Sequence, residues 1–272
     1  GRVHVPRMPY VVDVALAATK RFKHAILVNT KPPVAFFAYP NKPSLLLSED
    51  CQIHTLATVP EDGPQALVDL AKMLGAENAE IQCQPSDLPE MPAGKLDSDT
   101  ISAVVANVLP EGAIVSDESI SMGRNLLDFT KGCPPHDWLF ITGGSIGQGM
   151  PLATGAAVAC RDRPVLSLSG DGSAMYTLQS LWTQAREQLN VTTVIYANRS
   201  YAILHGELRN VGAQPGKNTR RLFDLENPHL NWVEMARGMG VDGVRVETAE
   251  ELHRAMSHGL STPGPYLIEA TC

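Results

Sequence analysis

The sequence predicts an α/β protein built on parallel β-sheet. Short apolar segments, such as residues 25–28 and 165–169, alternate with longer segments that carry the three-to-four-residue period of amphipathic helices. Glycine-rich turns follow two of the predicted strands, at residues 143–147 and 170–173. Strands that alternate with helices pair in parallel, because each helix carries the chain back across the sheet. The chain has 272 residues, 44% of them hydrophobic, which is ordinary globular composition.

The first part of the chain has few predicted strands. We expect, in order, a helix at residues 10–21, strands at 25–28 and 52–56, and a helix at 63–74. Two or three strands are too few for an independent doubly wound domain. Proline and glycine then become frequent among polar residues, which predicts a linker. We therefore divide the chain into a partial domain at 1–84, a linker at 85–97 and a second domain at 98–272.

The second domain has the longer series of elements. We expect helices at 98–109, 149–160, 174–189, 232–238 and 249–260, and strands at 113–116, 138–141, 165–169, 192–197, 244–246 and 266–270. In the helix at 174–189, Met175, Leu178, Leu181, Trp182, Ala185 and Leu189 would share one apolar face. The stretch from 198 to about 221 is predicted to be irregular, with a mobile lid over 205–221.

Charge, hydropathy and cysteine content exclude several classes of protein. The net charge of −7 lacks the basic footprint of a nucleic-acid-binding protein. No apolar run approaches the ~18 residues that span a bilayer, so we expect no membrane association and a cytoplasmic protein. The five cysteines are dispersed, which argues against a disulfide framework or a zinc site. The chain begins with Gly rather than Met, as expected for a piece of a longer protein, an expression scar or a cleavage product.

The turn Gly170-Asp171-Gly172-Ser173 is the most informative motif. Glycines let the backbone approach a ligand, and the helix that starts there favours phosphate. An aspartate among phosphate-binding N–H groups would repel the anion unless a cation lies between them, which predicts Mg²⁺ at Asp171. Asn198 ends the next strand, 27 residues later, and can supply a second oxygen; the Ser200 carbonyl can add a third. A Gly-Asp-Gly turn alone is common on surfaces, so the prediction depends on Asn198 and its spacing.

This arrangement resembles the thiamine diphosphate (ThDP) signature of the 2-keto acid decarboxylase and acetohydroxyacid synthase superfamily. The resemblance extends over residues 111–270, and the segments 182–187 and 197–204 are similar to benzoylformate decarboxylase and to acetolactate synthase large-subunit-like proteins. Residues 24–57 resemble part of the central domain of the same proteins. The resemblance implies a three-layer, parallel-sheet diphosphate-binding domain, preceded by part of a Rossmann-like central domain.

The resemblance also implies roles for particular residues. Asp171, Asn198 and the Ser200 carbonyl would bind Mg²⁺. Ile146 would wedge between the two rings of the cofactor, and the Gly144 carbonyl would accept from the aminopyrimidine. Ile203 and Leu204 would line the substrate pocket. The cofactor-binding set implied by the resemblance is Glu118, Ser119, Ser121, Gly144, Ile146, Gly170, Gly172, Ser173 and Tyr201.

The same resemblance implies that part of the active site lies elsewhere. The family activates the cofactor with a glutamate in a pyrimidine-binding domain, which we do not find in these residues, so no catalytic residue is assigned. We expect a ThDP- and Mg²⁺-dependent decarboxylase or carboligase acting on 2-keto acids, of which this is the C-terminal portion, inactive by itself. Another copy or chain would supply the pyrimidine domain, in a homodimer or homotetramer. The alternatives are a cofactor-binding subunit of a split enzyme and a catalytically inactive assembly module.

Overall fold

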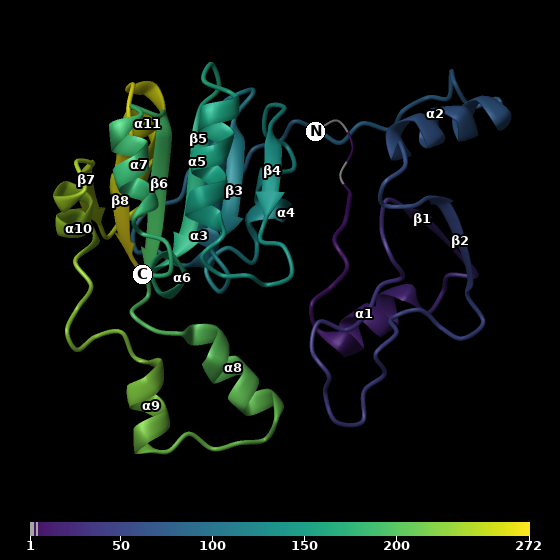
Figure 1. Cartoon of the computed structure of the whole chain (residues 1–272), viewed down its shortest axis with the longest axis horizontal. Helices are drawn as coiled ribbons and strands as arrows, with labels where there is room; N and C mark the ends of the chain where they lie inside the picture. Colours follow the sequence, from purple (N-terminus) through teal and green to yellow (C-terminus); the bar gives the residue numbers. More distant parts are fainter. Residues whose placement is uncertain (1–2, 4) are drawn as a thin grey trace. The chain divides into compact units, whose positions relative to one another are not determined.

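The computed structural model describes Val3 and residues 5–272. Residues 1, 2 and 4, which belong to the predicted partial domain, lie outside the described residues. The chain divides into two compact units, Val5–Cys83 and Gln84–Cys272 (Figure 1). Within the described part of the chain, no helix is long and apolar enough to cross a membrane.

The unit Val5–Cys83 is small. It contains α1 (Val12–Thr19), β1 (His24–Val28), β2 (Gln52–Ala57) and α2 (Gly63–Met73). The two strands pair in parallel, with Ala25 opposite Ile53. Its buried apolar cluster consists of Val12, Ala15 and Leu46. The predicted elements are confirmed here, and α2 begins where Asp62 accepts the N–H of Gln65, an N-cap that the sequence displays directly.

The unit Gln84–Cys272 is a six-stranded parallel sheet in the order β4-β3-β5-β6-β8-β7. Its strands are β3 (Ile114–Glu118), β4 (Asp137–Phe140), β5 (Val165–Gly170), β6 (Val191–Ala197), β7 (Asp242–Val246) and β8 (Tyr266–Thr271). Its helices are α3 (Ser98–Val108), α4 (Leu126–Thr130), α5 (Gly149–Ala159), α6 (Asp171–Ala174), α7 (Ser180–Arg186), α8 (Ala202–Asn210), α9 (Lys217–Phe223), α10 (Trp232–Gly238) and α11 (Ala249–Ser261).

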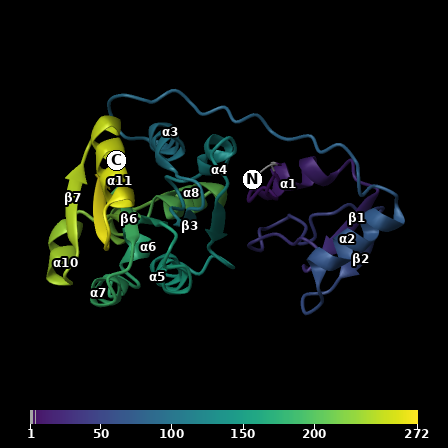
Figure 2. The same cartoon turned by 90° about the horizontal axis from the view of Figure 1, so that it is seen from above.

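Helices cover both faces of this sheet and create two apolar layers. One layer is buried between the sheet and α3, α4 and α11, and includes Ile101, Leu168 and Met256. The other is buried against α5, α7 and α10, and includes Met150 and Trp232 (Figure 2). The predicted α/β class with a three-layer parallel-sheet domain is therefore confirmed. The central strands are buried on both faces, which explains why neither β5 nor β6 contains a charged residue.

Two predictions about helices are wrong. The expected helix at 174–189 is split into α6 and α7 by tight turns, in which Tyr176 donates to Ser173 and Thr177 to Ala174. These hydrogen bonds reach back three residues, as in a 3₁₀-helix, and make a tighter turn than the four-residue bonds of an α-helix. The apolar side chains before and after the turn therefore no longer share one face. Met175 and Trp182, expected on the buried face, are 38% and 52% exposed, whereas Leu181 is buried.

The segment expected to be irregular up to residue 221 contains α8 and most of α9. Good helix formers in residues 202–209 outweigh the single Gly206, which the prediction treated as a loop signal. Gly212, at φ 71°, follows the end of α8, and Gly216 is the N-cap of α9. Neither helix contains a fully buried residue. Their sequences therefore lack the regular apolar spacing from which a helix is predicted. The short helix α4 was not predicted.

Candidate functional site

Most of the predicted site residues lie at the carboxyl ends of three adjacent strands, β3, β5 and β6, and the loop with Gly144 and Ile146 follows β4, the next strand of the sheet. The chain leaves β3 for β4 at the edge of the sheet and then returns to β5 on the other side of β3. The strand order therefore reverses between β3 and β5, and in open parallel sheets ligands bind at the crevice formed at such a reversal. The turns at 119–125 and 170–173 flank this position. A β-carbon built on Gly170 would lie 3.9 Å from the Ser119 carbonyl oxygen, which shows how closely the two turns approach.

Asp171 connects the ends of β5 and β6. Its side chain is almost fully buried; Oδ1 accepts the Gly172 N–H at 2.9 Å and Oδ2 accepts the Arg199 N–H at 2.7 Å. Burial raises the pKa of Asp171 to about 6, and the hydrogen bonds from Arg199 and Gly172 offset part of that rise. The carboxylate is thus held at the carboxyl end of the sheet, in surroundings where its charge is poorly solvated, and a cation nearby would stabilise it.

Asn198 and Ser200 form the turn that Asp171 holds. Asn198 follows the last residue of β6, and its Oδ1 accepts the Ser200 N–H at 3.0 Å. Arg199 between them has φ 55°, so the turn is tight and brings both neighbours beside Asp171. One carboxylate, one amide oxygen and one backbone carbonyl are all hard oxygen donors, the type that Mg²⁺ prefers. The residues present therefore fit a magnesium ion. The described residues contain no cluster of three or more His, Cys, Asp or Glu side chains arranged for a metal.

Gly172, Ser173 and Tyr201 lie together next to this turn. A β-carbon on Gly172 would lie 2.4 Å from Cε1 of Tyr201, so the aromatic ring packs directly on the glycine. Ser173 is buried, and its Oγ lies 3.8 Å from a β-carbon built on Gly170. The Tyr201 N–H donates to the Phe223 carbonyl at 2.8 Å, which connects the turn to the end of α9. The structure thus places these predicted residues around one backbone turn.

Ser119 and Ser121 occupy the turn after β3 but differ in their surroundings. Ser119 is buried, and both its N–H and its hydroxyl donate to Asp117 Oδ1. The Asp117 carboxylate also accepts the Trp138 indole N–H at 3.3 Å. Ser121 is half-buried. The prediction did not assign a role to Asp117, although an aspartate at a strand end two residues before a serine is a recognisable turn signal.

Glu118 is buried beneath the loop that carries Gly144 and Ile146. Its carboxylate accepts the N–H groups of Gly147 and Gly149, both at 2.9 Å. Ile146 is 36% exposed, and its N–H donates to the Gly144 carbonyl at 2.9 Å. The structure therefore brings the predicted loop and the predicted Glu118 together. The carboxylate lies on the buried side of the loop, and Ile146 is partly exposed to solvent.

The two predicted pocket residues lie in the first turn of α8. Leu204 is 40% exposed and Ile203 is half-buried. They come two and three residues after Tyr201, so the same turn positions them and the magnesium-binding candidates. Their exposure in this unit leaves apolar surface available beside the carboxyl ends of the strands.

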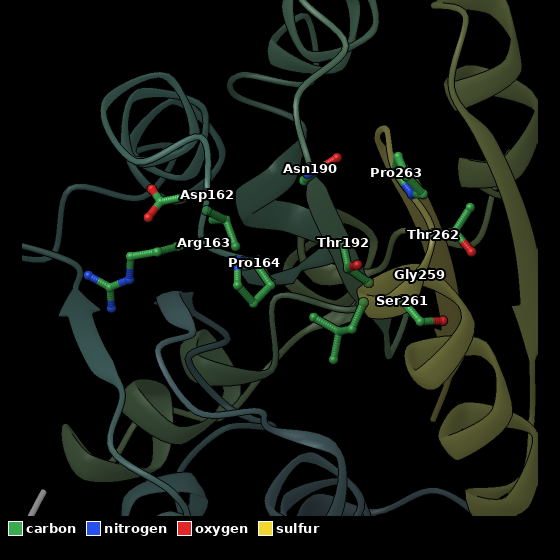
Figure 3. A pocket seen from close by; sticks show the side chains of 11 residues that line it. Asp162, Arg163, Pro164, Asn190, Thr192, Gly259, Ser261, Thr262 and Pro263 are labelled. Carbon is green, nitrogen blue, oxygen red and sulfur yellow. The ribbon is translucent and has the colours of Figure 1, made fainter.

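A cavity of about 190 Å³ lies at the opposite, amino end of the sheet, just before β5 and β6 begin (Figure 3). Arg163 and Asn190 are among its lining residues. The Arg163 guanidinium pairs with Asp137 at 2.6 Å, and Asn190 Oδ1 accepts the Gly264 N–H at 2.7 Å. These polar groups are engaged in the fold, and the cavity is separate from the site at the carboxyl ends.

Comparison with known proteins points to one family. Residues 121–270 match the family model described as "Thiamine pyrophosphate enzyme, C-terminal TPP binding domain". The chain is 46% identical over 267 residues to the Mycobacterium tuberculosis protein named "Putative acetolactate synthase large subunit IlvX", covering 97% of this chain and 52% of that protein. It is 32% identical over 192 residues to benzoylformate decarboxylase of Pseudomonas aeruginosa, covering 68% of this chain and 35% of the enzyme.

Solved structures agree with this. The thiamine diphosphate-dependent 4-hydroxybenzoylformate decarboxylase of Rhodococcus jostii RHA1 matches with a TM-score of 0.75 and 27% identity. The match covers 96% of this chain and 51% of that one. The chain thus spans about half the length of the first of these curated relatives and of this solved structure, and about a third of the Pseudomonas enzyme.

Proposed function

Because this chain belongs to the thiamine pyrophosphate enzymes, by its match to their C-terminal TPP-binding domain, we propose that it forms the diphosphate-binding part of an enzyme that decarboxylates or ligates 2-keto acids. The names of the relatives support the substrate class: one is named "Putative acetolactate synthase large subunit IlvX", and the others are named as decarboxylases of benzoylformate and of 4-hydroxybenzoylformate. The choice between a lyase and a transferase, and the particular keto acid, depend on a substrate pocket to which Ile203 and Leu204 contribute only one wall.

The observation that carries this proposal is the hydrogen bond from the Arg199 N–H to Asp171. It joins the ends of β5 and β6 and holds the turn that contains Asn198 and Ser200 against Asp171. These three would hold Mg²⁺, and the ion would neutralise the repulsion between Asp171 and a diphosphate. Gly172 and Ser173 would hold the diphosphate through N–H and hydroxyl donors. A phosphate bound there would lie among backbone donors at the crevice, as in other parallel sheets.

The remaining candidate residues would bind the rest of the cofactor and the substrate. When bound, ThDP supplies a carbon nucleophile for the keto carbonyl and accepts the electrons released as carbon dioxide leaves. Ile146 would fix the angle between its two rings, and Gly144 would accept a hydrogen bond from the aminopyrimidine. Ile203 and Leu204 would exclude water from the reacting carbon atoms. Ser119 would donate to the diphosphate after its hydroxyl turns away from Asp117.

We also propose that another copy or another chain supplies the pyrimidine-binding domain, in a homodimer or homotetramer. Supporting this, the chain covers only 52% of the relative with which it shares 46% identity. A cytoplasmic location stays a prediction of the sequence.

The turnover of 2-keto acids tests this proposal. With ThDP and Mg²⁺ added, the 272-residue chain alone should show negligible carbon dioxide release from pyruvate, benzoylformate and other 2-keto acids. Activity should appear when a chain carrying the pyrimidine-binding domain is added. Rapid decarboxylation by this chain alone would contradict the proposed division of the site, and persistent inactivity with a suitable partner chain would favour a catalytically inactive module.

A further inference from the structure

Glu118 joins three separate parts of the diphosphate-binding unit. It is the last residue of β3 and is 1% exposed. Its Oε2 accepts the N–H groups of Gly147 and Gly149, each at 2.9 Å, and its Oε1 accepts the Ser169 hydroxyl at 2.8 Å. Hydrogen bonds to an ionised acceptor are stronger than those between neutral groups, and these are shielded from water. The carboxylate therefore fixes the loop before α5 to β3 and β5.

The loop contacts Glu118 so closely that only glycine fits. A β-carbon on Gly149 would lie 2.6 Å from Cγ of Glu118. Gly147 has φ 92°, and a β-carbon there would lie 2.6 Å from the β-carbon of Tyr176. On its other side, the Gly147 carbonyl accepts the Thr177 hydroxyl at 2.8 Å. The backbone of Gly147 is thus held from both sides, and the neighbouring Ile146 is presented outward at 36% exposure.

We propose that Glu118 is a positioning residue: it binds no part of the cofactor and instead fixes the 144–149 loop, so that Ile146 and Gly144 meet the two rings of ThDP. This inference rests on the proposed function, and it replaces the expectation from sequence that Glu118 binds the cofactor. Both carboxylate oxygens of Glu118 already accept hydrogen bonds from the protein. A carboxylate in contact with the diphosphate would also repel it and weaken the binding of the cofactor.

The proposal separates the two ends of the cofactor. The diphosphate would be held by the turn at 170–173, by Ser119 and by Mg²⁺, whereas the hydrogen bonds that Glu118 accepts come from Gly147, Gly149 and Ser169. The rings would be held by the loop that it fixes. Removing the carboxylate should therefore weaken binding of ThDP and leave binding of inorganic pyrophosphate unchanged. A general loss of folding would weaken both equally.

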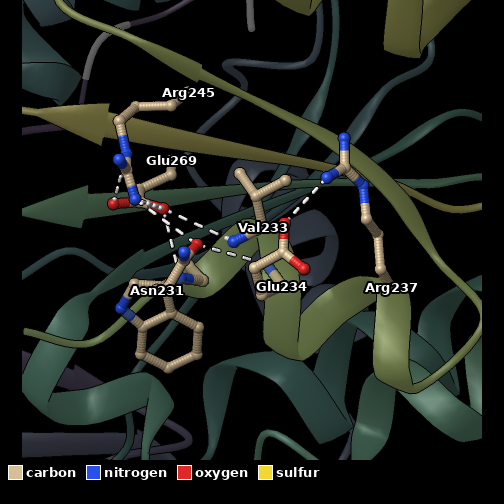
Figure 4. A network of polar contacts seen from close by, with 7 residues as sticks. Asn231, Val233, Glu234, Arg237, Arg245 and Glu269 are labelled. Carbon is tan, nitrogen blue, oxygen red and sulfur yellow. Dashed lines mark hydrogen bonds and ion pairs between the residues drawn. The ribbon is translucent and has the colours of Figure 1, made fainter.

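The chain contains a matched control for this test (Figure 4). Glu269 of β8 is also buried, at 2% exposure, and also accepts two backbone N–H groups, from Trp232 at 3.1 Å and Val233 at 3.4 Å, as well as the Arg245 guanidinium. It fixes α10 and not the loop at 144–149. The variant Glu269→Ala thus removes a buried carboxylate from the same unit without changing the proposed ring-binding loop.

The experiment is a calorimetric titration of the 272-residue chain with ThDP and, separately, with pyrophosphate, both in the same magnesium buffer. For Glu118→Ala we expect the dissociation constant of ThDP to rise about tenfold or more, with that of pyrophosphate within about twofold of wild type. Glu118→Gln should recover most of the loss, because its amide oxygen can accept both N–H groups and its NH₂ can donate to Ser169. Glu269→Ala should leave the ratio of the two constants unchanged.

Each other outcome has a definite meaning. Equal weakening of both ligands in Glu118→Ala, or an unchanged ThDP constant, would overturn the inference. Should Glu118→Ala not fold, Thr177→Val tests the same loop from its other side, and it should shift the ratio in the same direction by a smaller factor. Hydrogen exchange gives a readout without cofactor: the Gly147 and Gly149 amides should exchange at least about tenfold faster in the Ala variant than in wild type. A wild-type chain that binds neither ligand would contradict the proposed function instead.

Discussion

Replacing Asp171 with alanine is expected to weaken magnesium-dependent ThDP binding by at least about 100-fold, because it removes the one charged ligand in the proposed Mg²⁺ site. Asp171→Asn keeps the shape and one acceptor oxygen, which can still accept the Arg199 N–H, while the Gly172 N–H loses its acceptor. We expect this variant to fold like wild type and still to lose most of the magnesium dependence. Calorimetric titration with ThDP, with and without Mg²⁺, measures both effects.

Asp162→Ala is the matched control for this prediction. Asp162 is exposed and lies before β5 begins, at the other end of the same strand. Its removal changes the net charge equally but should not alter ThDP affinity. Binding by Asp171→Asn as tight and as magnesium-dependent as that of wild type would show that Asp171 only stabilises the turn at 198–200.

Replacing Gly172 with alanine is expected to weaken ThDP binding by about tenfold or more. The added methyl group would lie 2.4 Å from Cε1 of Tyr201 and 2.7 Å from its Cδ1, so the ring or the turn must move. That movement would displace the N–H group and the aromatic ring proposed to contact the cofactor. The measurement is the ThDP dissociation constant together with the melting temperature, which separates local displacement from loss of folding.

Gly155→Ala controls for the added methyl group. Gly155 lies within α5, and a β-carbon there would meet no atom within 4 Å. Alanine also favours a helix interior over glycine, by about 1 kcal/mol. This variant should bind ThDP like wild type and be slightly more stable. If Gly172→Ala bound ThDP as tightly as wild type, the close packing of Tyr201 on this turn would not be required for binding.

The sequence predicted the parallel sheet because its central strands are buried on both faces. Residues 165–170 and 191–197 lie between two layers of helices, so their side chains are apolar, small or uncharged on both faces, and the strands stand out from the charged segments around them. The turn at 170–173 was predictable for a related reason, since a buried strand must end where polar and glycine residues begin. These signals are local in the sequence.

The errors came from segments where the structure does not bury a continuous face. The helices α8 and α9 contain no fully buried residue, so no apolar period identifies them. Between α6 and α7 the chain tightens, and Met175 and Trp182 leave the face that a continuous helix would give them. Regular periodicity is lost in both cases, and a prediction based on periodicity fails there.

The candidate site was predictable in part. Asp171 and Asn198 follow strands that could be located from the sequence. Because the carboxyl ends of parallel strands lie at the same end of a sheet, both residues are expected there. The contact of Glu118 with Gly147 and Gly149 was not predictable, because it joins residues about thirty positions apart through backbone N–H groups that leave no side-chain signal. The same holds for the Arg199 N–H that Asp171 accepts, since any residue type could provide it.

The central claim is that this chain binds ThDP through Mg²⁺ at the carboxyl ends of β5 and β6, and titration of the wild-type chain with ThDP tests it most directly. With Mg²⁺ in excess we predict weak, saturable binding at a single site per chain, and with EDTA in place of Mg²⁺ we predict none. Equal binding in both buffers, or no binding with Mg²⁺ present, would contradict the account.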